Sequence, residues 1–171
     1  MKHIIYLTLL TLLVLFSCCK KKYEKRYPED TESTYDSPEE RLCDKWWVLD
    51  SVSVNGVNFT DSVHNMVGIY RFSISLNKIK SGIFEFRESL INIENPNVNF
   101  NVGFSTDKEF SSLYFVDLDG FFHGKDTVFS FIPFFYKPQS ANWDIRKLEQ
   151  HNLKIQTSGN DTVLINYFKS I

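Results

Sequence analysis

Residues 97–105, which read NVNFNVGFS, decide the fold that we expect for this chain. Apolar and polar residues alternate along the whole stretch, and its apolar face is formed by Val98, Phe100, Val102 and Phe104. Successive side chains of a β-strand point to opposite sides of the sheet. A strict period of two therefore predicts a strand with one buried face in an antiparallel sheet.

Short runs of a similar kind lie on both sides of this stretch. Residues 46–54 are rich in Trp and Val and are followed by Asn55-Gly56, which predicts a hairpin because both residues tolerate a positive φ. Residues 57–60 would return as a short strand, and residues 61–66 would form a loop or one helical turn. Further strands are expected at residues 67–76, 82–88, 112–118, 127–135, 143–148, 153–157 and 162–168. Residues 90–93 either extend the strand 82–88 or form a short strand of their own.

The composition agrees with an all-β body that forms one domain. Phe occurs 16 times and Tyr eight times, and strand-forming residues dominate after Trp46. About eight to ten short strands separated by turn residues favour a barrel or a sandwich. An open meander of that size would leave two sheet edges, whereas closure removes both. The formal net charge of −2 provides no basic field for nucleic acid.

The N-terminus predicts export from the cytoplasm. Residues 1–17 combine Lys2 with an apolar run that is too short for a spanning helix, which needs about 20 apolar residues. The segment Leu15-Phe16-Ser17-Cys18 resembles the lipobox of bacterial lipoproteins. The resemblance implies that residues 1–17 are removed and that Cys18 is acylated, by palmitate among other chains. An ordinary signal peptide or a short membrane anchor is the alternative.

Residues 18–41 are expected to be a lipidated, disordered tether. They lack an apolar period, are rich in charge and contain Pro28 and Pro38, so they cannot bury enough apolar surface to offset their ordering entropy. Basic residues beside the anchor favour contact with anionic headgroups, although a plain solvated linker fits as well. Cys19 and Cys43 either form a disulfide or stay as free thiols.

Residues 42–171 resemble the lipocalin-like lipoproteins of Gram-negative bacteria. The resemblance implies an antiparallel up-and-down barrel of about eight strands, with a first-strand tryptophan that plugs one end and no agreed ligand. It also implies an outer-membrane protein, which by its basic tether would face the periplasm, with exposure at the cell surface as the alternative. Many members have Gly where this chain has Asp44. The matching features are Leu42-x-x-x-x-Trp47-x-Leu49, Asn55-Gly56, Trp143-x-Ile145-x-x-Leu148, Leu153-x-Ile155 and the last aromatic strand.

No arrangement of residues in the sequence predicts catalysis, a cofactor or a metal site. His64, His123 and His151 are far apart, and no Gly-x-Ser-x-Gly elbow is present. Asp117-x-Asp119-Gly120 is best interpreted as a turn, because a calcium loop in that register would place Phe115 at its first ligand position. We therefore expect a protein that is not an enzyme.

Four tripeptides share the order Asp, hydroxyl residue, Val: residues 50–52, 61–63, 126–128 and 161–163. They are similar to an O-glycan acceptor sequence of one group of Gram-negative bacteria. The alternative is that Asp ends turns and that Ser-Val or Thr-Val begins strands.

Two functions remain open at this stage. The first is the binding of a small apolar ligand inside the barrel. The second is a structural or interaction role in the envelope, with a filled barrel and a protein partner that contacts the two-sided apolar run 128–136. The expected lining of the barrel consists of Phe72, Phe84, Phe86, Phe100 and Phe104.

Overall fold

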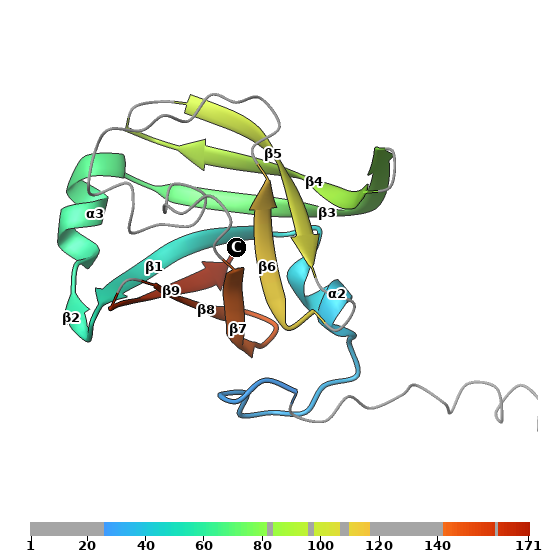
Figure 1. The fold of residues 1–171 in the computed structure, drawn as a ribbon, viewed down its shortest axis with the longest axis horizontal. Helices are drawn as coiled ribbons and strands as arrows, with labels where there is room; N and C mark the ends of the chain where they lie inside the picture. Colours follow the sequence, from blue (N-terminus) through green and yellow to red (C-terminus); the bar gives the residue numbers. More distant parts are fainter. Residues whose placement is uncertain (1–25, 82–83, 96–97, 107–109, 117–141, 160) are drawn as a thin grey trace, which may run out of the picture.

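A computed structural model describes residues 26–81, 84–95, 98–106, 110–116, 142–159 and 161–171 (Figure 1). Within these ranges the chain is mostly antiparallel β-sheet, so the all-β prediction is confirmed. The elements in chain order are α2 (Pro38–Leu42), β1 (Trp46–Val54), β2 (Val57–Asn58), α3 (Thr60–Val67), β3 (Tyr70–Ser81), β4 (Phe84–Ile93), β5 (Val98–Thr106), β6 (Ser112–Val116), β7 (Asn142–Leu148), β8 (Asn152–Gly159) and β9 (Thr162–Ser170).

The strands form one sheet in the order β2-β1-β3-β4-β5-β6-β7-β8-β9, and β1 also pairs with β9. Each of these pairings is antiparallel. The register shifts in β1 between Leu49 and Ser51 and in β7 between Ile145 and Lys147, and such irregularities bend a strand. Figure 1 shows the result, a strongly curled sheet with a concave inner side.

The first hairpin forms as its sequence predicts. β1 covers the predicted residues 46–54, and β2 returns with Val54 opposite Val57. Asn55 and Gly56 have φ values of 50° and 80°, which is the left-handed conformation that a two-residue hairpin turn requires. β5 also lies within one residue of its predicted bounds.

Residues 84–93 form one continuous strand, β4, in which residues 90–93 extend the predicted strand 82–88, and β3 and β5 both pair along it. One segment differs from the prediction. Residues 60–67 form the two-turn helix α3 rather than a loop or one turn, because Val63 and Val67 lie four positions apart and are both buried. The predicted strand 127–135, with the turn at Asp119-Gly120, lies outside the described residues.

The helix α3 ends at Gly68, where any residue with a Cβ atom would strain the backbone. Gly68 has φ 65° and ψ −132°, and a Cβ atom there would lie 2.8 Å from Glu94 Oε2 and 3.0 Å from Glu94 Cβ. The Glu94 carboxylate accepts a hydrogen bond from Ile69 N at 3.0 Å, so it is held in place. This turn therefore fixes the start of β3.

The sheet has two ends that differ in what lies over them. α2 lies at the end where β1 and β8 begin (Figure 1). We call this the strap end, after residues 27–42, the strap, which include α2. The Asn55-Gly56 hairpin and α3 lie at the opposite end, which we call the hairpin end. The buried core runs between them and includes Trp47 and Trp143, both buried almost completely.

Candidate functional site

The inner side of the curled sheet is the first part of the candidate site. Tyr70, Phe72 and Ile74 of β3 are fully buried, and they alternate with less buried neighbours as the predicted strand requires. Phe168 of β9 packs edge-on against Phe72 with ring centroids 5.0 Å apart, and its ring lies 6.3 Å from Tyr70. The aromatic rings of β3 and β9 thus form the centre of the core.

The inner side also carries polar groups, which the expected lining of five phenylalanines did not include. Ser89 of β4, Thr157 of β8 and Asn166 of β9 are buried among the apolar residues of their strands. Among the described residues, the Oγ atom of Ser89 has no hydrogen-bond partner. Burial also raises the pKa of the Tyr70 hydroxyl far above its usual range, so this group stays protonated and is a potential hydrogen-bond donor.

Only one of the five phenylalanines predicted to line the interior can be assessed by its side chain. Phe72 is buried, as expected. Phe84 and Phe86 lie in β4 and Phe100 and Phe104 lie in β5, but their side chains are outside the described part of the structure. The sheet ladder places Phe100 opposite Ile91 and Phe104 opposite Arg87.

The second part of the candidate site is a segment that the sequence predicts to be disordered. Residues 27–42, the strap, fold against the strap end of the sheet, whereas the sequence predicts a disordered tether for residues 18–41. Ser37 begins α2 with a capping box, in which its hydroxyl accepts from Glu40 N and the Glu40 carboxylate accepts from Ser37 N. Pro38 occupies the first turn, where its missing N–H costs nothing.

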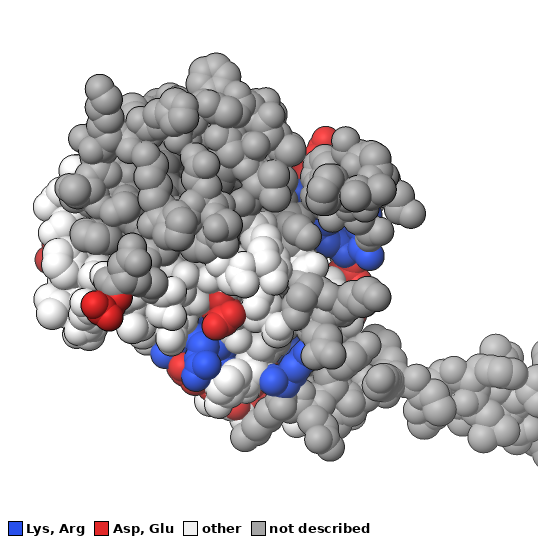
Figure 2. Space-filling view, in the orientation of Figure 1, with Lys and Arg blue, Asp and Glu red and all other residues white. Residues whose placement is uncertain are grey.

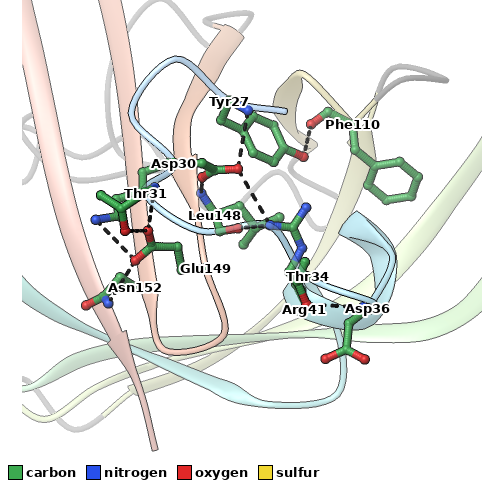
Figure 3. A network of polar contacts seen from close by, with 11 residues as sticks. Tyr27, Asp30, Thr31, Thr34, Asp36, Arg41, Phe110, Leu148, Glu149 and Asn152 are labelled. Carbon is green, nitrogen blue, oxygen red and sulfur yellow. Dashed lines mark hydrogen bonds and ion pairs between the residues drawn. The ribbon is translucent and has the colours of Figure 1, made fainter. Parts of the chain in front are cut away.

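The strap is held by a buried ion pair (Figure 3). Arg41 Nη1 lies 3.6 Å from Asp30 Oδ2, and the side chains of the two residues are 2% and 0% exposed. Arg41 Nη1 also donates to Leu148 O, while Asp30 Oδ1 accepts from Leu148 N at 2.9 Å. Both backbone groups at the end of β7 are therefore satisfied by the two side chains of the strap. The Arg41 guanidinium lies 5.8 Å from the centre of the Tyr27 ring.

A carboxylate in the β7–β8 turn binds the strap from the sheet side. Glu149 Oε1 accepts from Thr31 N at 2.9 Å and from Thr31 Oγ1 at 2.5 Å, and Lys147 lies 3.1 Å from Glu149 Oε2. Burial alone would raise the pKa of Glu149, but the hydrogen bonds from Thr31 and the charge of Lys147 outweigh it and lower this pKa to about 2. The carboxylate is therefore ionised at all ordinary pH values.

A second buried arginine lies at the same end. Arg87 of β4 is 4% exposed, pairs with Glu39 of α2 and donates to Leu76 O. Its guanidinium lies 5.9 Å from the centre of the Phe110 ring, and the Phe110 carbonyl accepts from the Tyr27 hydroxyl at 2.8 Å. The strap is therefore joined to β4 and β7, and to the chain just before β6.

The turn before β1 contains a residue with a left-handed backbone. Asp44 has φ 54°, a conformation that glycine adopts without strain. Asp44 Oδ1 accepts from Leu76 N at 2.8 Å, and Asp44 N donates to Ile74 O at 2.8 Å. These bonds offset the strain of the left-handed backbone. Beyond the turn, the Trp47 indole donates to Leu42 O at 2.9 Å, which joins the strap to β1.

The remaining side chains that could take part in catalysis or bind a metal lie far from one another. His64 and His151 are both exposed, on α3 and in the β7–β8 turn, and His123 lies outside the described residues. Cys43 is a buried free thiol, and burial, with a smaller effect of Asp44, raises its pKa to about 12. Among the residues that the structure describes, no three His, Cys, Asp or Glu side chains come together as a metal site.

The tripeptides of the order Asp, hydroxyl residue, Val lie in different surroundings. Ser62 is exposed on α3, whereas Ser51 in β1 and Thr162 at the start of β9 are half-buried. Residues 126–128 lie outside the described ranges.

The visible surface carries charges of both signs close together (Figure 2). Ion pairs occur among the described charged residues, since Glu29 lies 2.6 Å from Lys154 and 3.7 Å from Arg146. Within the described ranges no helix has the length and apolar character needed to cross a bilayer. The predicted signal peptide, Cys18 and Cys19 lie outside these ranges.

No family model, curated protein or solved structure matches this chain. The similarity to lipocalin-like lipoproteins therefore stays a prediction, and functional arguments depend on the residues described above.

The strap could have been found in part from the sequence. Ser37-Pro38-x-Glu40 is a helix-start signature that is visible without a structure. No comparable signal marks Asp30 and Arg41, because their burial depends on the end of β7, more than 100 residues away along the chain.

The buried ion pair leads to a prediction about stability. Replacing Arg41 with Met leaves the Asp30 carboxylate buried without its cation, which should lower the free energy of unfolding by about 3–5 kcal/mol. The double variant Asp30→Asn/Arg41→Met should lose at least about 1 kcal/mol less than the sum of the single variants, because the two residues interact directly. Urea unfolding followed by tryptophan fluorescence measures the free energy of unfolding of Asp30→Asn, of Arg41→Met and of the double variant.

The control for this comparison is Glu32→Gln, which changes an exposed carboxylate of the same strap and should alter the free energy of unfolding by no more than about 0.5 kcal/mol. Additive effects of the Asp30 and Arg41 variants would show that the pair does not hold the strap.

A second prediction concerns pH. Because folding lowers the pKa of Glu149 from 4.5 to about 2, its ionisation stabilises the folded state above pH 4.5, and this stabilisation is lost as the pH falls toward 2. Glu149→Gln should therefore lose less stability than the unaltered protein between these two pH values. Urea midpoints measured across the range provide the comparison, and parallel curves for the two proteins would contradict the assignment.

Proposed function

We propose that this chain is an acyl-anchored lipoprotein of the outer membrane of a Gram-negative bacterium and that it faces the periplasm. We propose further that its curled sheet is a lipocalin-like barrel, which binds a small apolar ligand and is not an enzyme. The anchor is supported by the lipobox-like segment that ends at Cys18. Several acyl chains bind a bilayer stably where one does not, since each buried CH₂ contributes about 0.8 kcal/mol.

The barrel is supported by the pairing of β1 with two further strands. β3 pairs with β1 through Trp47 and Phe72, and β9 pairs with β1 along residues 47–54. The up-and-down order of the strands and the buried Trp47 at one end agree with the lipocalin-like pattern. With the strap and Trp47 over one end, a ligand would enter from the hairpin end.

One observation carries the ligand-binding proposal, namely the polar atoms on the inner side of the sheet. The Ser89 hydroxyl is buried and has no hydrogen-bond partner in the described part of the structure, which costs about 1–3 kcal/mol in an interior without compensation. A ligand with one polar group and an apolar body would satisfy this hydroxyl and would pack against the rings of Phe72 and Phe168. Ligand sites of barrels commonly combine mostly apolar walls with a few polar groups.

The anchor leads to a third prediction. Cys18→Ser removes the acylated thiol, so the protein should move from the membrane fraction to the soluble fraction. Cys19→Ser is the matched control and should leave the protein in the membrane fraction. Mass spectrometry of the N-terminal peptide measures the acyl chains directly, and an unmodified Cys18 in a membrane-bound protein would contradict the proposal.

A fourth prediction tests ligand binding. The uncharged dye N-phenyl-1-naphthylamine should bind the protein with enhanced fluorescence, and Ser89→Phe, which fills the interior beside Phe72, should weaken binding at least about tenfold, or about 1.4 kcal/mol. Ser158→Phe places the same ring on the exposed side of β8 and should bind as the unaltered protein does. Urea unfolding verifies that both variants are folded, and a failure of the unaltered protein to bind would overturn the proposal.

The alternative is a structural or interaction protein of the envelope, and a different observation favours it. Trp47, Trp143 and Phe168 are each buried almost completely, so large rings fill much of the described core. Eight-stranded barrels are often filled by their own side chains. Crosslinking of the membrane-bound protein, followed by identification of its partner, supports this alternative if the dye does not bind.

A further inference from the structure

The strap limits how far the sheet can move from the site of the proposed acyl anchor. Among the described residues, Tyr27 is already docked, since its hydroxyl donates to Phe110 O at 2.8 Å. Glu29 N donates to Arg146 O at 2.9 Å, and the Asp30–Arg41 ion pair follows. From Tyr27 onward the chain is therefore part of the folded body.

At most the eight residues 19–26 connect Cys18 to the docked residue Tyr27. An extended chain spans at most about 3.5 Å per residue, so this segment reaches no further than roughly 30 Å. A tether that ended at residue 41, as the sequence predicts, would reach roughly 80 Å and would allow either end of the sheet to approach the membrane.

The length of the sheet turns this limit into a preferred orientation. β1 has nine residues and runs from the strap end to the hairpin end, a distance of about 30 Å at 3.3 Å per residue. If the hairpin end faced the bilayer, residues 19–26 would have to be fully extended along the whole sheet, with a large loss of chain entropy. With the strap end toward the bilayer, no such extension is needed.

We infer that the strap end, with the β7–β8 turn, lies against the lipid bilayer and that the hairpin end, with α3 and Asn55-Gly56, points away from it. This inference rests on the proposed acyl anchor at Cys18. It assigns the membrane as the partner of one end of the sheet and leaves the other end accessible to soluble ligands or proteins.

Energy transfer to labelled lipids tests the orientation in the full acylated chain. The donor dye is attached to Gln150→Cys, in the β7–β8 turn, or to Val57→Cys, at the hairpin, both of which are exposed positions. Both variants also carry Cys19→Ser, and the buried thiol of Cys43 is protected from labelling. The protein is incorporated into phosphatidylcholine vesicles that contain a rhodamine-labelled lipid as acceptor.

Transfer from position 150 should exceed transfer from position 57 severalfold. Inserting about fifteen Gly and Ser residues after Arg26 lengthens the connection as a flexible coil, so both efficiencies should fall and should converge. Equal transfer from the two positions without the insertion, or greater transfer from position 57, would overturn the orientation.

Flotation of the vesicles separates this outcome from a failure of the anchor. A protein that floats with the vesicles but gives equal transfer overturns the orientation alone. A protein that does not float, and whose Cys18 carries no acyl chain, overturns the proposed anchor and with it the orientation.

Discussion

The structure depends on one buried ion pair, between Asp30 and Arg41, at the end of β7. A buried pair of charges is expensive to desolvate, and it is stable only where further hydrogen bonds satisfy both partners. Here the two bonds to the backbone of Leu148 and one from Tyr27 N meet part of that need. The consequence is a strap whose position is set by directional contacts, whereas a purely apolar contact would permit several positions.

The value of this constraint is that it joins distant parts of the chain. The strap contacts β1 through the Trp47 indole, β4 through the ion pair of Glu39 with Arg87, and the β7–β8 turn through Thr31 and Glu149. Two strands and one turn that are far apart in sequence are thereby joined by one short segment. These contacts of the strap all lie at the strap end of the sheet.

The sheet could be predicted from the sequence more fully than the strap. Alternation along residues 98–106 and the Asn55-Gly56 pair act over a few residues, so β5 and the first hairpin lie where they were expected. The strap contains many charges and prolines, which on average indicate disorder. The prediction of disorder from composition does not hold here, because a few of the charged side chains form buried contacts with residues far away in the chain. Local sequence patterns carry no information about those residues. The same reasoning explains why Ser89 and Asn166, polar residues in otherwise apolar strands, were absent from the predicted lining.

Asp44 shows how the cost of a left-handed backbone conformation is offset by hydrogen bonds around it. A left-handed backbone at a residue with a Cβ atom costs about 1–2 kcal/mol, a cost that glycine avoids. The side chain of Asp44 recovers part of it through the hydrogen bond from Leu76 N, and the same bond attaches the turn to β3 just where the register between β3 and β4 shifts. The aspartate therefore links the start of β1 to an irregular part of β3, a contact that glycine has no atoms to make. Since Trp47 and the strap lie directly beside this turn, the hydrogen bonds of Asp44 add to the contacts at the end of the sheet that the strap already covers.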